Sequence, residues 1–212
     1  MRITVFGATG NVGSRVVTEA LARGHQVTAV LRDPSRPHRL PAAAALAVGD
    51  ARNPEDVARL AAGQDLVVAA TRPAPGQEAE LAAATRGLLA GLAGTDVRLL
   101  AVGGAGSLAL PGTDGATVID GPDFPADWLP IALACNEQLD LYRADGGVDW
   151  TYLSPAAVLE PGERTGRYRL GRDELLVDAD GASAISMEDL AVALLDEAEQ
   201  PAHRRVRFTA AY

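Results

Sequence analysis

The 212-residue chain contains no lysine, so all 19 of its Lys and Arg positions are arginine. A mechanism that needs a lysine side chain is therefore excluded. Cys135 is the single cysteine, which excludes an intrachain disulfide and argues against a zinc site built on cysteines. A chain without disulfides suits a reducing compartment, so we expect a cytoplasmic location.

Long apolar runs and excess positive charge are also absent. No run is long enough to cross a bilayer, and we expect no signal peptide because the first apolar run is short and leads directly into glycines. The net charge of −9 argues against nucleic acid or an anionic membrane as the main partner. The three histidines lack metal-ligand spacing, so no metal site is expected.

The residues that are present fit one domain, 1–212, with 48% apolar content. Strands are expected at 2–6, 25–31, 46–48, 65–70, 97–102 and 148–153, and helices at 11–23, from Pro54, at 77–93 and at 131–145. Asn53 is the expected N-cap of the second helix. Val- and Leu-rich strands separated by helices predict an α/β, doubly wound parallel sheet covered on both faces.

The pattern changes after the core segment 1–155. Residues 156–185 contain two strand-like pieces, 166–171 and 174–178, among turns. Ser186 begins a final helix with a capping-box pattern, and 205–209 is the expected last strand. Because the segment 156–212 is too small for a separate domain, we expect a small C-terminal cap over the substrate.

A glycine-rich turn, GATGNVG at 7–13, lies between the first strand and the first helix. Gly7 permits a tight turn, Gly10 lets the backbone approach a pyrophosphate, and Gly13 lets the helix pack against the strand. The open N–H groups of the helix would face the anion. This strand–turn–helix context predicts a dinucleotide site rather than an ordinary turn. Its expected contacts are Gly7, Thr9, Gly10, Asn11, Val12 and Gly13.

The end of the second strand bears on the choice of dinucleotide. Arg32 follows that strand about 20 residues after the turn, and an arginine there accommodates a 2′-phosphate. Arg36 or Arg15 could add a second contact. NADP(H) is therefore favoured over NAD(H), although Asp33 would favour NAD(H) if its carboxylate faced the ribose instead.

Further candidates follow the other strands. Asp50 could accept from the adenine amino group, or it could cap the loop before the second helix. Ala70 ends the fourth strand and Thr71 follows it, and both are expected to contact the cofactor. The loops 71–76 and 103–130 follow strand ends, where ligands bind in such sheets, unless they are plain connections. Within these loops we expect Arg72, Phe124 and Trp128 to contact substrate, although the two aromatics could simply pin the loop.

Several motifs together resemble the atypical short-chain dehydrogenases/reductases, in particular their small NAD(P)H-binding branch of NmrA-like and biliverdin-reductase-B-like proteins. They are GATGNVG at 7–13, LRDPSR at 31–36, VGD at 48–50, AVGGAGSL at 101–108, WTYLSPA at 150–156 and ISMEDLA at 185–191. The resemblance implies a Rossmann-like fold, NADP(H) as the usual cofactor and varied substrates. It also implies that Ser154 and Pro155 lie near the nicotinamide carboxamide.

The chain departs from this family at the reacting groups. Standard members use a Tyr-x-x-x-Lys pair and a serine, whereas the matching helix from Leu129 has neither Tyr nor Lys at that place. Ser107 matches the serine and could bond a substrate carbonyl while water supplies the proton, or it could be a turn residue. Cys135, with Asn136 and Glu137, lies where the pair is missing and could orient substrate, although a buried cysteine at a helix–sheet contact is the simpler interpretation.

These features predict an NADPH-dependent oxidoreductase acting on a small conjugated or aromatic carbonyl, quinone or flavin-like substrate, as a monomer or homodimer. Two alternatives stay open. One is a non-enzymatic NADP-binding sensor of the NmrA type, and the other is a biosynthetic isomerase or cyclase on the same scaffold.

Trp150 and Tyr152, in the sixth strand, are expected to face the core.

Overall fold

The computed structural model describes residues 1–36 and 38–212, and within them one large sheet of eight strands forms the centre of the fold. Its strands are β1 (Arg2–Phe6), β2 (Gln26–Leu31), β3 (Ala45–Val48), β4 (Leu66–Ala69), β5 (Arg98–Val102), β6 (Trp150–Ser154), β8 (Arg169–Gly171) and β10 (Arg207–Ala211). Their spatial order is β3-β2-β1-β4-β5-β6-β10-β8, and all pairs are parallel except β10 with β8. The predicted doubly wound sheet is confirmed.

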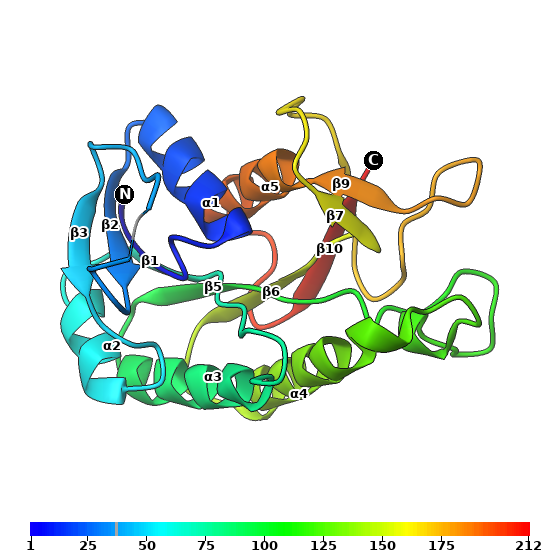
Figure 1. The fold of residues 1–212 in the computed structure, drawn as a ribbon, viewed down its shortest axis with the longest axis horizontal. Helices are drawn as coiled ribbons and strands as arrows, with labels where there is room; N and C mark the ends of the chain where they lie inside the picture. Colours follow the sequence, from blue (N-terminus) through cyan, green and yellow to red (C-terminus); the bar gives the residue numbers. More distant parts are fainter. Residues whose placement is uncertain (37) are drawn as a thin grey trace.

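Helices cover both faces of this sheet (Figure 1). They are α1 (Asn11–Ala22), α2 (Pro54–Ala61), α3 (Ala79–Leu92), α4 (Leu129–Ala144) and α5 (Met187–Glu199). Helices α1 and α5 pack together on one face, while α2, α3 and α4 line the other. Successive side chains of β4 point to opposite faces of the sheet. Val68 lies in the core under α1 and α5, whereas Val67 lies in the core under α3 and α4.

The helix starts follow from local chemistry. The side chain of Asn53 accepts a hydrogen bond from the N–H of Glu55 at 3.0 Å, as predicted for the N-cap of α2. Ser186 accepts from the N–H of Asp189 at the start of α5. The expected capping box is only half formed, because the Asp189 carboxylate instead accepts from Thr165, Gly166 and the Tyr212 hydroxyl.

The C-terminal segment contributes more to the body of the fold than to a cap. Helix α5 and strand β10 belong to the main layers, and a second, two-stranded parallel sheet joins β7 (Val158–Glu160) to β9 (Ala184–Ser186). The predicted strand 174–178 is wrong, since only Glu174 forms an isolated bridge, with Ala109. The last strand starts later than expected, at Arg207, because Arg205 takes a left-handed conformation with φ 56°.

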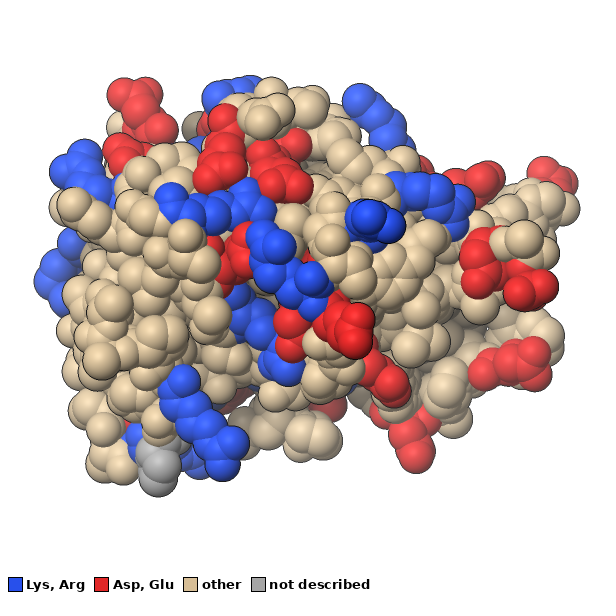
Figure 2. Space-filling model, turned by 90° about the horizontal axis from the view of Figure 1, so that it is seen from above, with Lys and Arg blue, Asp and Glu red and all other residues tan. Residues whose placement is uncertain are grey.

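The loop predicted at 103–130 lies beyond the end of β5 and carries two short 3-10 turns, η1 (Val118–Asp120) and η2 (Ala126–Trp128) (Figure 1). It ends at 128 rather than at the predicted 130, because α4 begins at Leu129. On the face that carries α1 and α5, arginines and acidic side chains are interspersed rather than segregated (Figure 2). Glu19, for example, pairs with both Arg23 and Arg164. Within the described parts of the chain, no helix is both long and apolar enough to span a membrane.

Candidate cofactor and substrate cleft

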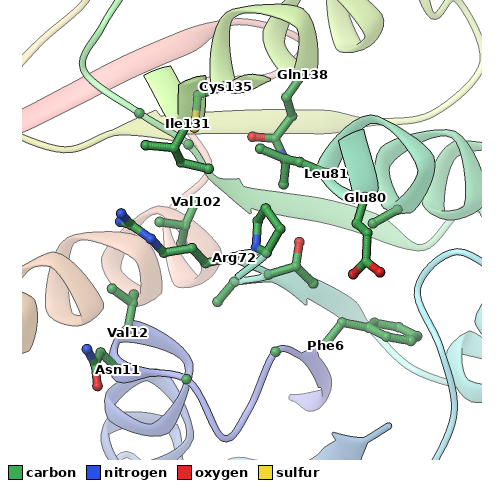
Figure 3. A pocket seen from close by; sticks show the side chains of 18 of the residues that line it. Phe6, Asn11, Val12, Arg72, Glu80, Leu81, Val102, Ile131, Cys135 and Gln138 are labelled. Carbon is green, nitrogen blue, oxygen red and sulfur yellow. The ribbon is translucent and has the colours of Figure 1, made fainter. Parts of the chain in front are cut away.

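A cleft of about 1030 Å³ lies at the carboxyl ends of β1 to β6. In a doubly wound sheet this is the edge at which ligands bind. The first turns of α1, α3 and α4 and the loops after β4 and β5 form its walls (Figure 3). Most of the residues singled out from the sequence line it: Gly7, Thr9, Gly10, Asn11, Val12, Arg32, Arg36, Asp50, Ala70, Thr71, Arg72, Phe124, Trp128, Cys135 and Pro155.

The glycine turn has the geometry that its spacing predicts. Gly7 has φ 79°, and a Cβ there would lie 2.3 Å from the carbonyl oxygen of Ala70. A Cβ on Gly13 would lie 2.1 Å from the carbonyl oxygen of Gly7. Gly13 therefore brings α1 against the turn and does not itself line the cleft, whereas Gly10 does.

The amino end of α1 is open to the cleft. Its N-cap is Gly10, no side chain caps it, and its first turn carries no acidic residue. By contrast, α2 and α5 each have a side-chain cap and two acidic residues in the first turn. The free N–H groups and the positive helix end thus favour an anion at Asn11 and Val12. Thr71 adds a buried hydroxyl that has no partner among the described residues. This cradle and its unpaired hydroxyl fit a dinucleotide.

Charged side chains gather at the end of the cleft next to β2. Glu80, in the first turn of α3, accepts from Arg32 at 3.1 Å and from Arg52 at 2.7 Å. Asp50 accepts from the other side of the Arg52 guanidinium at 2.6 to 3.1 Å, and these hydrogen bonds hold the pKa of Asp50 below its usual value. Arg52 and Glu80 were not predicted as site residues.

The two other groups considered for the ribose end each have a hydrogen-bond partner of their own. Asp33 folds back onto Ser35, accepting from its N–H at 2.9 Å and from its hydroxyl at 2.6 Å, and the hydroxyl bond lowers the pKa of the Asp33 carboxyl. Arg15 pairs with Glu188 at 2.5 Å. Asp33 nevertheless lines the cleft, together with Arg32 and Arg36.

The opposite end of the cleft is largely apolar. Val102, Leu159 and Met187 line it together with Phe124 and Trp128 from the loop after β5. Figure 3 shows the Arg72 guanidinium extended across this region, between Val12 of α1 and Ile131 of α4. An apolar pocket with one extended cation suits a flat conjugated molecule with a polar or anionic edge.

One polar pair on this side was missed from the sequence. Gln138 is 1% exposed yet lines the cleft, and its Oε1 lies 3.2 Å from the hydroxyl of Tyr152. That hydroxyl also lies 3.0 Å from the Cys135 carbonyl oxygen, a second acceptor for its proton, and it accepts from the N–H of Gly104 at 3.2 Å. The Gln138 amide nitrogen has no hydrogen-bond partner in residues 1–36 and 38–212, and the side chain points into the cleft (Figure 3). Such a residue is invisible in the sequence because its partner lies on another element.

Neither titratable group near Gln138 is an effective acid or base. Burial raises the pKa of Cys135 to about 11, although the charge of Arg72 opposes this. Burial also raises the pKa of Tyr152 well above its usual value, and Tyr152 and Trp150 lie in the core as predicted. Both the thiol and the phenol therefore stay protonated at neutral pH.

The two predicted serines are not brought to the cleft. The hydroxyl of Ser107 accepts from the buried guanidinium of Arg207 at 2.9 Å, and that guanidinium also binds Asp173. Ser154 is fully buried in β6 and its hydroxyl has no partner in the described structure. Glu137, next to Cys135, pairs with Arg86 at 3.0 Å. Across the described residues, no cluster of three or more His, Cys, Asp or Glu could hold a metal ion.

Fold and cleft together define a dinucleotide-binding α/β protein of the atypical short-chain dehydrogenase/reductase type. A family model described as NAD(P)H-binding matches residues 7–201. The chain belongs to this NAD(P)H-binding family.

Similar proteins agree with this assignment. The chain is 41% identical over 216 residues to the uncharacterized protein YwnB of Bacillus subtilis, covering 99% of this chain and 97% of that one. It is similar to the crystal structure of a "putative exported protein" from Burkholderia pseudomallei (TM-score 0.90, 39% identity, all of both chains). It is also similar to that of a "putative NADH-flavin reductase" from Streptococcus pneumoniae (TM-score 0.88, 33% identity, 100% and 99% of the chains).

Proposed function

We propose that this protein is an NADPH-dependent oxidoreductase that reduces a small conjugated or aromatic carbonyl compound, a quinone or a flavin. One observation carries the proposal: the open amino end of α1 leads, within a single cleft, to an apolar pocket that contains Arg72 and Gln138. The similar protein from Streptococcus pneumoniae, described as "a putative NADH-flavin reductase", supports the same class of reaction.

The chain offers a distinct contact for each part of the cofactor. The N–H groups at the start of α1 would hold the pyrophosphate, and Thr71 would offer its hydroxyl. Arg32 and Arg52 would bind a 2′-phosphate, which supports the preference for NADP(H). The bound cofactor would supply a hydride from its nicotinamide ring. Pro155 lines the cleft, and its proposed role beside the carboxamide rests on family resemblance.

The chain's own residues would act by positioning. No Tyr-Lys pair is present, and Cys135 and Tyr152 remain protonated, so we assign proton donation to water. A carbonyl compound would gain a hydride at carbon and a proton at oxygen, a flavin would gain both at ring nitrogens, and a quinone would end with one hydrogen on each oxygen. In each case NADPH plus one proton is consumed for each molecule reduced. Gln138 would donate to the substrate oxygen that becomes more negative. Holding two reactants in place can lower a barrier by about 7–11 kcal/mol.

The test is NADPH oxidation with a panel of quinones, flavins and conjugated ketones, followed by absorbance at 340 nm. We expect turnover with at least one flat conjugated acceptor. NADPH binding without turnover on any acceptor would contradict the enzymatic proposal and favour the second candidate, an NADP-binding sensor. The observation that favours the NADP-binding sensor is that none of Ser107, Cys135 and Tyr152 is an effective proton donor.

Location and assembly are part of the same proposal. We place the protein in the cytoplasm, where reduced cofactor is available, as a monomer or homodimer. The similar Burkholderia protein is described as exported, so cell fractionation is a direct check. Recovery in the extracellular fraction would contradict the proposed location.

A further inference from the structure

We propose that Glu80 sets the balance between NADPH and NADH by competing with the 2′-phosphate for Arg32 and Arg52. The inference rests on the proposed function in one respect, that a nicotinamide dinucleotide binds in this cleft. It concerns a residue of α3, far in sequence from the glycine turn and from the end of β2.

The two guanidinium groups converge on one carboxylate. Glu80 Oε2 accepts from Arg32 Nη1 at 3.1 Å, and Glu80 Oε1 accepts from Arg52 Nη1 at 2.7 Å. Asp50 holds the far side of Arg52, so that Nη1 is directed at Glu80. All four side chains line the cleft, and Glu80 points into it (Figure 3). An anion held between two guanidinium groups marks the place where another anion can bind.

The pairing is exposed enough to open. The side chains of Arg32, Arg52 and Glu80 are 58%, 40% and 29% exposed. Exposed pairs of this kind contribute little to stability. A phosphate offers more negative charge and more acceptor oxygens than a carboxylate, so a 2′-phosphate would displace Glu80 from both arginines. A ribose 2′-hydroxyl would not.

With NADH, the same carboxylate has the opposite effect. An acidic side chain beside the ribose accepts a hydrogen bond from the 2′-hydroxyl and favours NAD(H). Asp33 and Asp50 also line the cleft, but Asp33 accepts from Ser35 and Asp50 accepts from Arg52, so neither joins the two arginines. Glu80 is the carboxylate that binds both arginines, so it would weaken NADPH binding while favouring NADH, and its removal should change the two affinities unequally.

The experiment measures the dissociation constants of NADPH and NADH by nucleotide fluorescence for the wild type and for Glu80→Gln. We expect NADPH to bind about fivefold to tenfold more tightly to the variant, while NADH binds equally or more weakly. Glu78→Gln is the matched control, because Glu78 adjoins the same helix start but bonds the N–H of Gly76. Arg52→Ala should weaken NADPH by a larger factor than NADH.

The fragments 2′,5′-ADP and 5′-ADP separate the phosphate effect from the nicotinamide end and should show the same shift. Circular dichroism melts establish that each variant is folded. Equal changes for NADPH and NADH in Glu80→Gln, or no change, would overturn the inference while leaving the proposed function intact. If the wild type binds neither nucleotide, the proposed function itself fails.

Discussion

Two arginine–glutamate clusters lie at opposite ends of the sheet and differ in their surroundings. At the amino ends of the strands, Arg98 and Glu197 pair at 2.5 Å with side chains 7% and 4% exposed. His203 and Thr151 complete this cluster, and the imidazole of His203 stacks on Phe208. At the carboxyl ends, Glu80 pairs with arginines that remain in contact with solvent.

The same residue types form both clusters, so burial decides whether an arginine–glutamate pair stabilises the fold or can bind a ligand. A buried pair that loses one partner leaves an uncompensated charge, so it must stay closed. An exposed pair costs little to open, so it can exchange one anion for another. The ion pairs of Glu80 in the cleft can therefore open for a ligand, whereas the ion pair of Arg98 and Glu197 at the opposite edge must stay closed.

The largest expected effect comes from breaking the closed cluster. Glu197→Ala should lower the free energy of unfolding by about 3–5 kcal/mol, because Arg98 is left buried without its carboxylate. Glu80→Ala, the matched change at the open cluster, should alter it by less than about 1 kcal/mol. Urea unfolding monitored by circular dichroism measures both. Similar losses for the two variants would remove the distinction.

A substitution at Gly13 tests whether the glycine turn at the cleft is rigid, although the ion pairs beside it are open to solvent. Gly13→Ala should cost about 1–3 kcal/mol and weaken dinucleotide binding, because the new Cβ meets the carbonyl oxygen of Gly7. Gly147→Ala is the control, since nothing lies within 4 Å of a Cβ there. Thermal melts and NADPH titration supply the measurements. An unaffected Gly13→Ala would mean that the turn is looser than its geometry indicates.

Gln138 tests whether the apolar half of the cleft contributes to the reaction. Gln138→Leu should lower kcat/KM about tenfold, the value of one hydrogen bond of about 1.4 kcal/mol, with the dissociation constant of NADPH unchanged. Gln138→Glu should not restore the rate, since a carboxylate donates nothing. Steady-state kinetics on the best acceptor decide the point, and an unchanged rate in Gln138→Leu would assign the amide to packing alone.

The smallest effect is the part of the pH dependence of stability that Glu197 contributes at the closed cluster. Burial alone would raise the pKa of Glu197, but hydrogen bonds from His203 and Arg98 outweigh it and lower the pKa. A lowered folded-state pKa stabilises the protein above the unfolded value of about 4.3, and this stability is lost as pH falls through the folded pKa. Urea unfolding below pH 5 should show a steeper decline for the wild type than for Glu197→Gln. Parallel curves would contradict this.

Local patterns in the sequence predicted the fold and the glycine turn well. Asn53 caps α2 and Gly13 packs against Gly7, because each interaction involves near neighbours in the chain. The pairing of Glu80 with Arg32 joins residues 48 positions apart, and no local rule finds it. Ser107 matched a motif, yet Arg207, 100 residues later, holds its hydroxyl. Side-chain partners from distant elements decide which motif residues face the ligand.

Strand β10 lies between β6 and β8 although it follows both in the sequence. During synthesis, one edge of β6 therefore stays unpaired until β10 has left the ribosome, and until then β8 has no partner strand in the large sheet. The nucleotide half, β1 to β5, is available for folding well before the strands beside the substrate loop. We expect a chain truncated before Arg207 to aggregate rather than fold as a smaller nucleotide-binding protein, and its solubility would show which occurs.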